Sequence, residues 1–473
     1  MTDHSPHTPT LAIIGGGLSG AALAYRLALD APPAVRILVI EPRAELGRGV
    51  AYSTPDPDHR LNVPHTKMSI RTDDMAHFAL WLASPAGPTL PAKSATLAGQ
   101  IFAPRAVFGD YVADSLAPFL AQGRIRHLPT QATDIRPDGT HYTITLADGG
   151  SLRADTVFLA LTHPAPSIPA QLAGIADATL VPDAFAPGAL AGVARADRVL
   201  VVGSGLTAAD ILATLDRQGH SGPIHVISRH GWRSRPHGPA QAETQADFAT
   251  APATTALGLL CNVRRALATD AARGLTWHAV FDRLRAQGPA IWAALPQTER
   301  QRVLRHLRAL WDIHRFRIAP QTHEVVERLD RTGRAGFLTG RLVSADRSPD
   351  GIRLTWRTRG AAGLSTLTID RIILATGPDH ARITETAPLF RALAARGLVT
   401  ADPLRLGLAT APDGLALQPT GTPRPGLYVA SPLARGTVGE LMGVPEVTAW
   451  AEQVARHALA ALHERLPQSV QRR

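Results

Sequence analysis

Three glycines near the start of the chain have the spacing of a dinucleotide-binding turn. Gly15, Gly17 and Gly20 follow an apolar run at residues 11–14 and precede a helical pattern. Glycine at the first position permits a tight turn, at the second lets the backbone approach a pyrophosphate, and at the third lets the helix pack on the strand. Glu41 follows about 20 residues later, where an acid accepts hydrogen bonds from a ribose 2′-OH. These four residues predict a dinucleotide site, since a turn that binds nothing would leave the position of Glu41 to chance.

A second turn of the same kind lies in the middle of the chain. Gly203, Gly205 and Ala208 follow an apolar run at residues 198–202, and alanine is accepted at the third position. The next apolar run, residues 224–228, ends not in an acid but in Arg229. A guanidinium matches phosphate geometry, and an arginine near this point accommodates the 2′-phosphate of NADP. We therefore expect NADPH here in preference to NADH; the alternative is that Arg229 is one more surface arginine.

The hydrophobic pattern supplies the elements that must hold these turns. Near-continuous apolar runs are typical of strands in parallel sheets that helices cover on both faces. Such runs lie at residues 11–14, 36–40, 156–161, 198–202, 224–228, 372–375 and 426–430. Helical periodicity covers residues 21–29, 255–268, 276–286, 298–310 and 445–466. We therefore expect an α/β fold with two Rossmann-like dinucleotide-binding domains and an additional helical segment.

The formal net charge of +10 at pH 7 raises the question of a nucleic-acid partner. The 49 lysine and arginine residues include only two lysines, Lys67 and Lys93, and the arginines are scattered through predicted helices and strands. A nucleic-acid-binding protein gathers positive charge on one face and adds stacking rings, whereas aromatic residues make up only 5% of this chain. We expect no nucleic-acid partner, and instead an attraction for small anionic ligands.

Cys261 is the only cysteine of the chain. A single thiol excludes an intramolecular disulfide, a Cys-x-x-Cys redox pair and a cysteine-built zinc site, so we expect no metal and electron transfer only through a bound cofactor. No run reaches the roughly 18 apolar residues of a membrane span, and the first residues lack the basic start and apolar core of a secretory signal. We expect a cytoplasmic protein without a membrane partner.

Two unlike dinucleotide turns in one chain resemble the two-dinucleotide-binding-domain flavoproteins, a glutathione-reductase-like class. In that class FAD binds the N-terminal unit, NADPH binds an inserted unit, and the chain then returns to complete the FAD domain. Residues 374–378, which include Thr376 and Gly377, match the Ala-Thr-Gly linker of that class. Residues 159–164 are a variant of it, with Thr162-His163 where Thr-Gly is usual.

More closely, the chain resembles the bacterial FAD/NAD(P)-binding proteins of the YdhS-like group, which are related to flavin-dependent N-hydroxylating monooxygenases. The similarity spans nearly the whole chain. The matching segments are residues 49–52, 61–64, 68–69, 104–105, 109–111, 311–315 and 436–446.

The resemblance implies a domain division and a set of cofactor contacts. It implies a discontinuous FAD-binding domain at residues 1–165 and 335–473, and an NADP-binding domain with a helical insertion at residues 195–334. The implied FAD contacts are Gly15, Gly17, Gly20, Glu41, Asn62, Thr376 and Gly377, and the implied NADPH contacts are Gly203, Gly205, Ala208 and Arg229. Ser431-Pro432 stands where many flavoprotein reductases present a Gly-Asp pair, so a flavin contact there is expected from backbone N–H groups or from Arg435.

The leading functional hypothesis is a single-component, FAD-dependent monooxygenase that consumes NAD(P)H. It would use O₂, through a peroxyflavin, to hydroxylate a small substrate such as an amino acid or amine. One alternative is a reductase that passes electrons from NADPH through FAD to a quinone, a metal complex or a partner protein; another is a non-catalytic flavin-binding sensor. The sequence identifies no catalytic acid or base. It offers only His65 and Lys67 as candidate contacts to flavin or substrate, and an ordinary solvated lysine is the simpler interpretation of Lys67.

Overall fold

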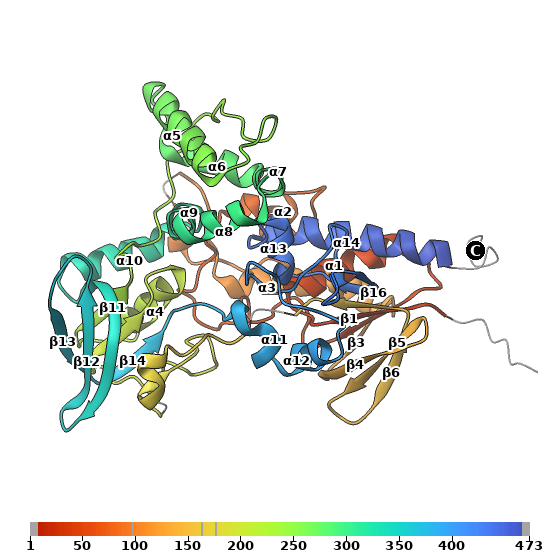
Figure 1. Ribbon diagram of the computed structural model, residues 1–473, viewed down its shortest axis with the longest axis horizontal. Helices are drawn as coiled ribbons and strands as arrows, with labels where there is room; N and C mark the ends of the chain where they lie inside the picture. Colours follow the sequence, from red (N-terminus) through yellow and green to blue (C-terminus); the bar gives the residue numbers. More distant parts are fainter. Residues whose placement is uncertain (1–7, 97, 162–163, 176, 466–473) are drawn as a thin grey trace, which may run out of the picture.

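The computed structural model describes residues 8–96, 98–161, 164–175 and 177–465. A six-stranded sheet forms the body of the first unit (Figure 1), in the order β15-β16-β7-β1-β2-β3. Neighbouring strands are parallel except for the pair β15 and β16. The bounds are β1 Thr10–Ile14, β2 Arg36–Ile40, β3 Ile125–Leu128, β7 Thr156–Leu159, β15 Leu415–Leu417 and β16 Pro423–Val429.

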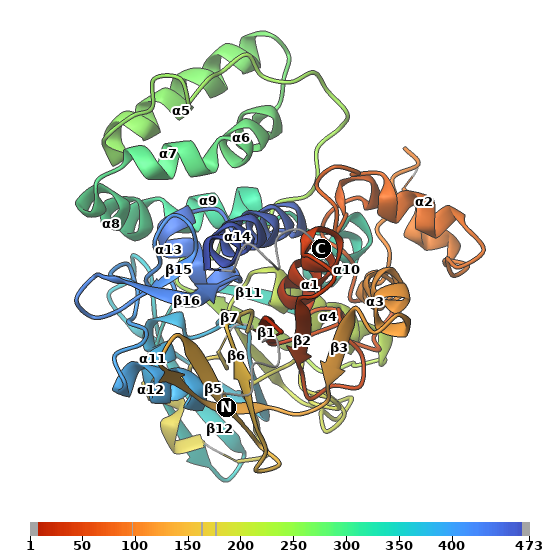
Figure 2. The same cartoon turned by 90° about the vertical axis from the view of Figure 1, so that its right-hand side faces the viewer.

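Helices from both ends of the chain cover this sheet. Helix α1 (Leu18–Asp30) buries small and apolar residues such as Ala21, Ala24 and Leu27, and α14 (Val444–Arg465) lies beside it (Figure 2). Helix α3 (Arg105–Ala121) also packs against α1. The last helix therefore completes the unit that the first strand begins.

A seven-stranded sheet forms the second unit, in the order β13-β12-β11-β10-β9-β14-β8. Strands β8 to β11 and β14 pair in parallel, whereas β11, β12 and β13 form an antiparallel extension at one edge. The bounds are β8 Leu180–Val181, β9 Val199–Val202, β10 Ile224–Ser228, β11 Ala335–Ser348, β12 Gly351–Thr358, β13 Leu364–Ile369 and β14 Arg371–Leu374.

The sheet pairing corrects the expected domain boundary at residue 335. Residues 335–374 form β11 to β14, which belong to the second sheet and not to the first. The chain returns to the first unit only after β14. The reason is hydrogen bonding: β14 pairs with β9, with Leu374 opposite Val202, so it completes the sheet that carries the second glycine turn.

The helices between β10 and β11 divide into two groups. Helix α10 (Pro320–Arg331) packs on α4 (Leu206–Arg217) within the second unit. The others form the helical insertion, which projects from the two sheets in both views (Figures 1 and 2). They are α5 Ala256–Ala272, α6 Trp277–Ala286, α7 Gly288–Ala294, α8 Gln297–His306 and α9 Arg308–Arg315.

The helical patterns are confirmed, although several bounds differ by a few residues. Thr255 caps α5 by accepting a hydrogen bond from the N–H of Gly258, so the helix starts one residue later than expected. The single helix expected at residues 298–310 is two helices, because Leu307 interrupts it with φ −113° and ψ −18°.

The remaining elements are short. An antiparallel three-stranded sheet lies beside the first unit, with β4 Ala132–Asp138, β5 His141–Leu146 and β6 Ser151–Ala154. The remaining α-helices are α2 His77–Ala83, α11 Ile383–Thr386, α12 Pro388–Ala395 and α13 Arg435–Val438. Short 3₁₀ turns are η1 His65–Lys67, η2 Ala92–Ser94, η3 Ala170–Ile175, η4 His380–Arg382 and η5 Pro432–Ala434. In the described ranges, every helix is too short or too polar to cross a lipid bilayer.

Candidate functional site

The first glycine turn joins β1 to α1 and has the backbone geometry that its sequence predicts. Gly15 has φ +98°, a conformation that favours glycine, and a Cβ on Gly20 would lie 1.9 Å from the carbonyl oxygen of Gly15. Gly17 precedes α1, and no described side chain caps the first N–H groups of the helix. A Cβ on Gly17 would lie 3.4 Å from Cα of Gly49. The turn thus offers free N–H groups in a narrow space, which fits a pyrophosphate.

Glu41 lies next to this turn, directly after β2. Glu41 is 4% exposed, and its Oε2 accepts a hydrogen bond of 2.8 Å from the N–H of Gly16. Oε1 accepts from the backbone and the guanidinium of Arg43, at 3.1 and 3.0 Å. The structure therefore brings Glu41 to the glycine turn; that it binds a ribose stays a prediction.

The second glycine turn joins β9 to α4 in the same way. Gly203 has φ +116°, and a Cβ there would lie 2.3 Å from the carbonyl oxygen of Ala375. Around Gly205, at the start of α4, a Cβ would meet no described atom within 4 Å. A cavity of about 220 Å³ opens at this point, and its lining includes Gly205, Ala208, Trp232, Arg233 and Arg235. The uncapped helix start and the open space fit a second pyrophosphate.

Arg229 follows β10 as expected, but its side chain is exposed and does not line this cavity. It has no ion-pair partner in the part of the chain that the structure describes. Beside it, His230 stacks on Trp232 with ring centroids 4.7 Å apart. That Arg229 binds a 2′-phosphate stays a prediction.

The linker residues Thr376 and Gly377 lie at the second turn, not at the first. They follow β14 directly, and the preceding Ala375 contacts the Gly203 position. The corresponding segment of the first unit follows β7. There, a Cβ added to Gly15 would lie 2.9 Å from the carbonyl oxygen of Ala160. Thr162 and His163, the expected variant of the linker, lie outside the described residues.

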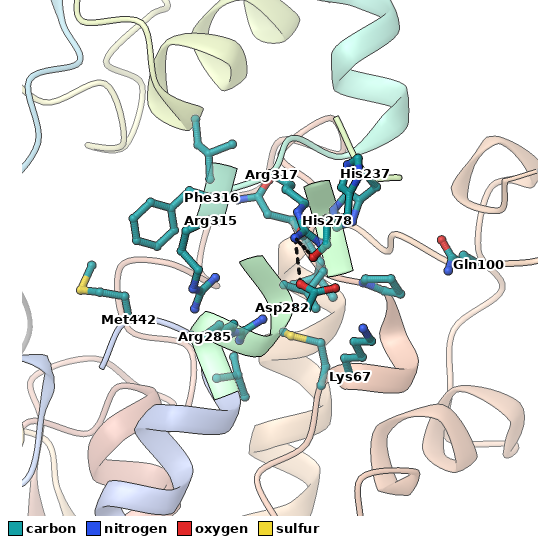
Figure 3. Close-up of a pocket in the computed structure, with 18 of the residues that line it drawn as sticks. Lys67, Gln100, His237, His278, Asp282, Arg285, Arg315, Phe316, Arg317 and Met442 are labelled. Atoms are coloured by element: carbon teal, nitrogen blue, oxygen red, sulfur yellow. Dashed lines mark hydrogen bonds and ion pairs between the residues drawn. The ribbon is translucent and has the colours of Figure 1, made fainter. Parts of the chain in front are cut away.

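A larger cavity of about 470 Å³ lies between the two units and the helical insertion (Figure 3). Asn62 and Lys67 line it from the first unit, and Thr207 and Asp210 line it from α4. The insertion and the adjoining loops contribute His237, His278, Phe281, Asp282, Arg285, Arg315 and Arg317. The cavity is therefore built from three separate parts of the chain.

The two candidate contacts from the sequence, His65 and Lys67, have different surroundings in the structure. Lys67 lines the large cavity and is exposed, whereas His65 does not line it. The Nδ1 atom of His65 accepts a hydrogen bond of 3.3 Å from the N–H of Ile101. His65 thus supports a loop, and Lys67 is left as the candidate that faces the cavity.

The cavity wall is rich in cations, but its arginines are paired. Arg105 pairs with Asp210, Arg317 with Asp282, Arg285 with Glu446, and Arg315 with Glu440. Lys67 has no ion-pair partner among the described residues, so it carries the uncompensated charge of the wall. His237 adds a neutral ring: burial lowers its pKa to about 4, and Nε2 donates to the carbonyl oxygen of Asn62 at 2.9 Å.

Sequence reasoning missed most of the cavity wall. Arg315 lines the cavity and Glu440 pairs with it; both fall in segments that the family resemblance singled out, 311–315 and 436–446, yet neither was recognised as part of a site. Nothing in the local sequence marks His237 or Arg285, which lie in a loop and on the helix α6. Arg435, one of the two sources expected for a flavin contact, is 9% exposed, and its Nη1 donates to the sulfur of Met442.

The described side chains give no support for a metal site or for thiol chemistry in either cavity. Among the described residues, no group of three or more histidine, cysteine, aspartate or glutamate side chains is arranged to hold a metal ion. Cys261 is exposed on α5 and lines neither of the two cavities.

Comparison with known families and structures defines the class of fold. Residues 12–164 match the model of a protein family described as FAD-NAD(P)-binding. The matched stretch contains the first glycine turn and Glu41. A search of curated proteins finds no significant match.

Solved structures of two-dinucleotide-binding-domain flavoproteins have a similar fold and align over nearly the whole chain. L-lysine 6-monooxygenase from Pseudomonas syringae aligns with a TM-score of 0.64 at 18% identity, over 96% of this chain and all of that one. The ornithine N-hydroxylase from Kutzneria sp. 744, solved with reduced FAD, NADP⁺ and L-ornithine, aligns with a TM-score of 0.63 at 16% identity, over 98% and 100%. Thioredoxin reductase from Lactococcus lactis aligns with a TM-score of 0.50 at 11% identity, over 97% and 100%. These likenesses confirm the predicted fold class.

Proposed function

We propose that the protein is an FAD-dependent monooxygenase that consumes NADPH and hydroxylates a small amino-acid or amine substrate. The observation that carries this proposal is the large cavity, which both glycine-turn units and the helical insertion line. A bound flavin would supply the hydride acceptor and the oxygen activation that such a reaction needs. The role left to the chain is to bind, orient and shield the reactants.

The charges of the cavity wall favour a substrate with a carboxylate. Lys67 is the unpaired cation, and a carboxylate of the substrate would complete a charge-assisted hydrogen bond with it. Asp282, which lines the same cavity, is already paired with Arg317 at 2.8 Å. The charge left over on the described wall is therefore positive, which favours a carboxylate on the substrate. Two of the solved structures of similar fold are named as a lysine monooxygenase and an ornithine hydroxylase, which supports this substrate class by analogy.

The cysteine count argues against a reductase that uses a protein dithiol. Such an enzyme needs two cysteines close to the flavin, and the sequence contains one, on the exposed surface of α5. A reductase acting on a quinone, a metal complex or a protein partner is the remaining alternative.

The test measures NADPH oxidation, O₂ consumption and product together, using purified FAD-loaded protein and a panel of amino acids and amines. A substrate should accelerate NADPH oxidation and appear as a hydroxylamine, with one NADPH, one proton and one O₂ consumed for each hydroxylamine and each water formed. If no amine changes the rate and only an artificial electron acceptor does, the protein is a reductase. Retained FAD with negligible NADPH oxidation would identify a flavin-binding sensor.

A further inference from the structure

One face of α4 carries a polar stripe that packs against the first unit, buried at Asp210 and Thr214 and exposed at Arg217. Asp210, Thr214 and Arg217 lie at positions i, i+4 and i+7, so they share one face of the helix. Asp210 is 3% exposed and Thr214 4%. A helix that merely packed on a neighbouring domain would bury apolar residues on such a face. The polar stripe therefore calls for specific partners.

The partner of Asp210 comes from the start of α3 in the first unit. Nη2 of Arg105 lies 2.7 Å from Oδ2 of Asp210, and the two side chains are 12% and 4% exposed. Nε of Arg105 donates to the carbonyl oxygen of Arg60 at 3.0 Å, which fixes the guanidinium to the first unit. The pair is thus a directional link between the units.

The rest of the stripe meets the loop before residue 60. Thr214 Oγ1 donates to Oδ2 of Asp56 at 2.7 Å, and Nη2 of Arg217 donates to the same oxygen at 2.7 Å. The ring Nε2 of His59 lies 3.0 Å from Thr214 Oγ1. Each contact joins α4 to the first unit through a hydrogen bond of defined geometry.

The position of α4 matters because the helix starts at the second glycine turn. Gly205 precedes it, and Leu206, Thr207 and Asp210 line the large cavity. A shift of the stripe along the first unit would therefore move the predicted NADPH turn relative to the predicted FAD turn.

We propose that Arg105 and Asp210 are positioning residues whose ion pair sets the separation of the two nucleotide sites. The inference rests on the proposed function, since it concerns the approach of the hydride donor to the flavin. Interfaces between domains of one chain are often polar and allow relative motion, so a buried charged pair is a means of selecting one arrangement. Reactions between bound groups fall steeply in rate when the groups are displaced by about 1 Å.

The kinetic test uses Asp210→Asn, which keeps the shape of the side chain and removes its charge. In anaerobic stopped-flow experiments, flavin reduction at saturating NADPH should slow by about 10- to 100-fold. The Kd of NADPH should change by less than about threefold, because the NADPH turn itself is intact, and the reaction of chemically reduced protein with O₂ should be unchanged. The exchanged pair Arg105→Asp with Asp210→Arg should recover part of the loss.

Asp216→Asn is the matched control, because Asp216 lies on the same helix and pairs with Arg328 of α10 within the second unit, at 2.6 Å. This variant should reduce its flavin at the unsubstituted rate. If Asp210→Asn does not fold, Arg105→Lys keeps the charge, loses the planar fork, and is expected to slow flavin reduction in the same direction.

A second readout needs no cofactor. Spin labels at Leu29→Cys on α1 and Leu364→Cys on β13, both more than half exposed, report the separation of the units once Cys261 is replaced by serine. The distance distribution in cofactor-free protein should broaden with Asp210→Asn and not with Asp216→Asn. An unchanged distribution together with an unchanged reduction rate would overturn the positioning role. Failure of NADPH to reduce the flavin of the unsubstituted protein would instead overturn the proposed function.

Discussion

Arg315 and Glu440 form an ion pair that is almost closed to solvent. Nε and Nη2 of the guanidinium both donate to Oε1 of the carboxylate, at 3.0 and 2.7 Å, and the side chains are 6% and 7% exposed. Next to it, Arg285 pairs with Glu446 at 2.5 and 2.9 Å. Both arginines come from the helical insertion, whereas Glu440 precedes α14 and Glu446 lies in its first turn. The two pairs therefore attach the insertion to the first unit at the cavity wall.

Glu440→Gln should destabilise the protein strongly, because it removes the nearer counter-charge of the buried Arg315 guanidinium and leaves only Glu446, at 3.6 Å. Breaking one partner of a buried pair costs about 3–5 kcal/mol of unfolding free energy. Urea denaturation measures the loss. Glu385→Gln is the control: its partner is Arg382, both side chains are more than half exposed, and the loss should stay below about 1 kcal/mol. Equal losses of unfolding free energy in the two variants would contradict the burial of the Arg315–Glu440 pair.

Gly17→Val should abolish flavin retention. A Cβ at this position already lies 3.4 Å from Cα of Gly49, so the branched methyl groups would fill the space before the start of α1. The absorbance spectrum of the purified variant should lack the flavin bands. Gly192→Val is the control, since a Cβ there meets no described atom within 4 Å and its φ is not positive. A yellow, fully loaded Gly17→Val protein would refute the assignment of this turn.

Arg229→Ala should weaken NADPH binding with little effect on NADH. The exposed guanidinium lies after β10 without an ion-pair partner among the residues described, so it is free to meet a 2′-phosphate. Losing a hydrogen bond to a charged group costs about 1.5–3 kcal/mol, or about 10- to 150-fold in Kd. Titration with both nucleotides checks this, with Arg353→Ala on β12 as the control. Equal changes for NADPH and NADH would count against the assignment.

Lys67→Ala should raise the KM of a carboxylate-bearing substrate by about 10-fold or more, as expected for a charge-assisted contact of roughly 1.5–3 kcal/mol. The rate of flavin reduction by NADPH should change little, since the proposed contact is to the substrate. The matched control is Lys93→Ala, the other lysine of the chain, which pairs with Asp58 at 3.1 Å away from the cavity wall. An unchanged KM would return Lys67 to the role of a solvated surface residue.

Stability should fall in acid through His237. Burial lowers its pKa from the usual 6.5 to about 4. Between pH 4 and 6.5 the imidazole is therefore protonated in the unfolded chain and neutral in the folded protein. The contribution of the neutral ring is complete above pH 6.5 and is lost as the pH falls towards 4; the difference amounts to roughly 3 kcal/mol. His237→Gln should flatten the dependence of urea stability on pH in this window by that amount. His457→Gln, on the exposed side of α14, should leave it unchanged.

The two glycine turns were predictable because a short stretch of sequence determines each strand, turn and helix. Gly15 and Gly203 take the positive φ that the motif demands, and Glu41 reaches the first turn because β2 pairs with β1 in register, Ile40 opposite Ile14. The division between the units was not predictable in the same way. Strands β11 to β14 could have joined either sheet by their apolar pattern, and only their pairing with β9 and β10 decides it.

The cavity wall lay beyond sequence reasoning for a related reason. Asp210 and Thr214 have a helical spacing that the sequence shows, but their partners Arg105 and Asp56 stand more than 100 residues earlier. A polar residue on a predicted helix is usually assigned to the solvent side, and only the packing of the two units reveals that this face is buried.

The order in which the chain is made has a consequence for the nested sheets. Every strand of the seven-stranded sheet lies between residues 180 and 374, whereas the six-stranded sheet receives β15, β16 and the covering helix α14 from residues 415–465. A ribosome therefore releases a complete inner unit while the outer one still exposes the unpaired edge of β7. If translation stopped early, the seven-stranded sheet would be complete, whereas the exposed edge of β7 would be prone to aggregation.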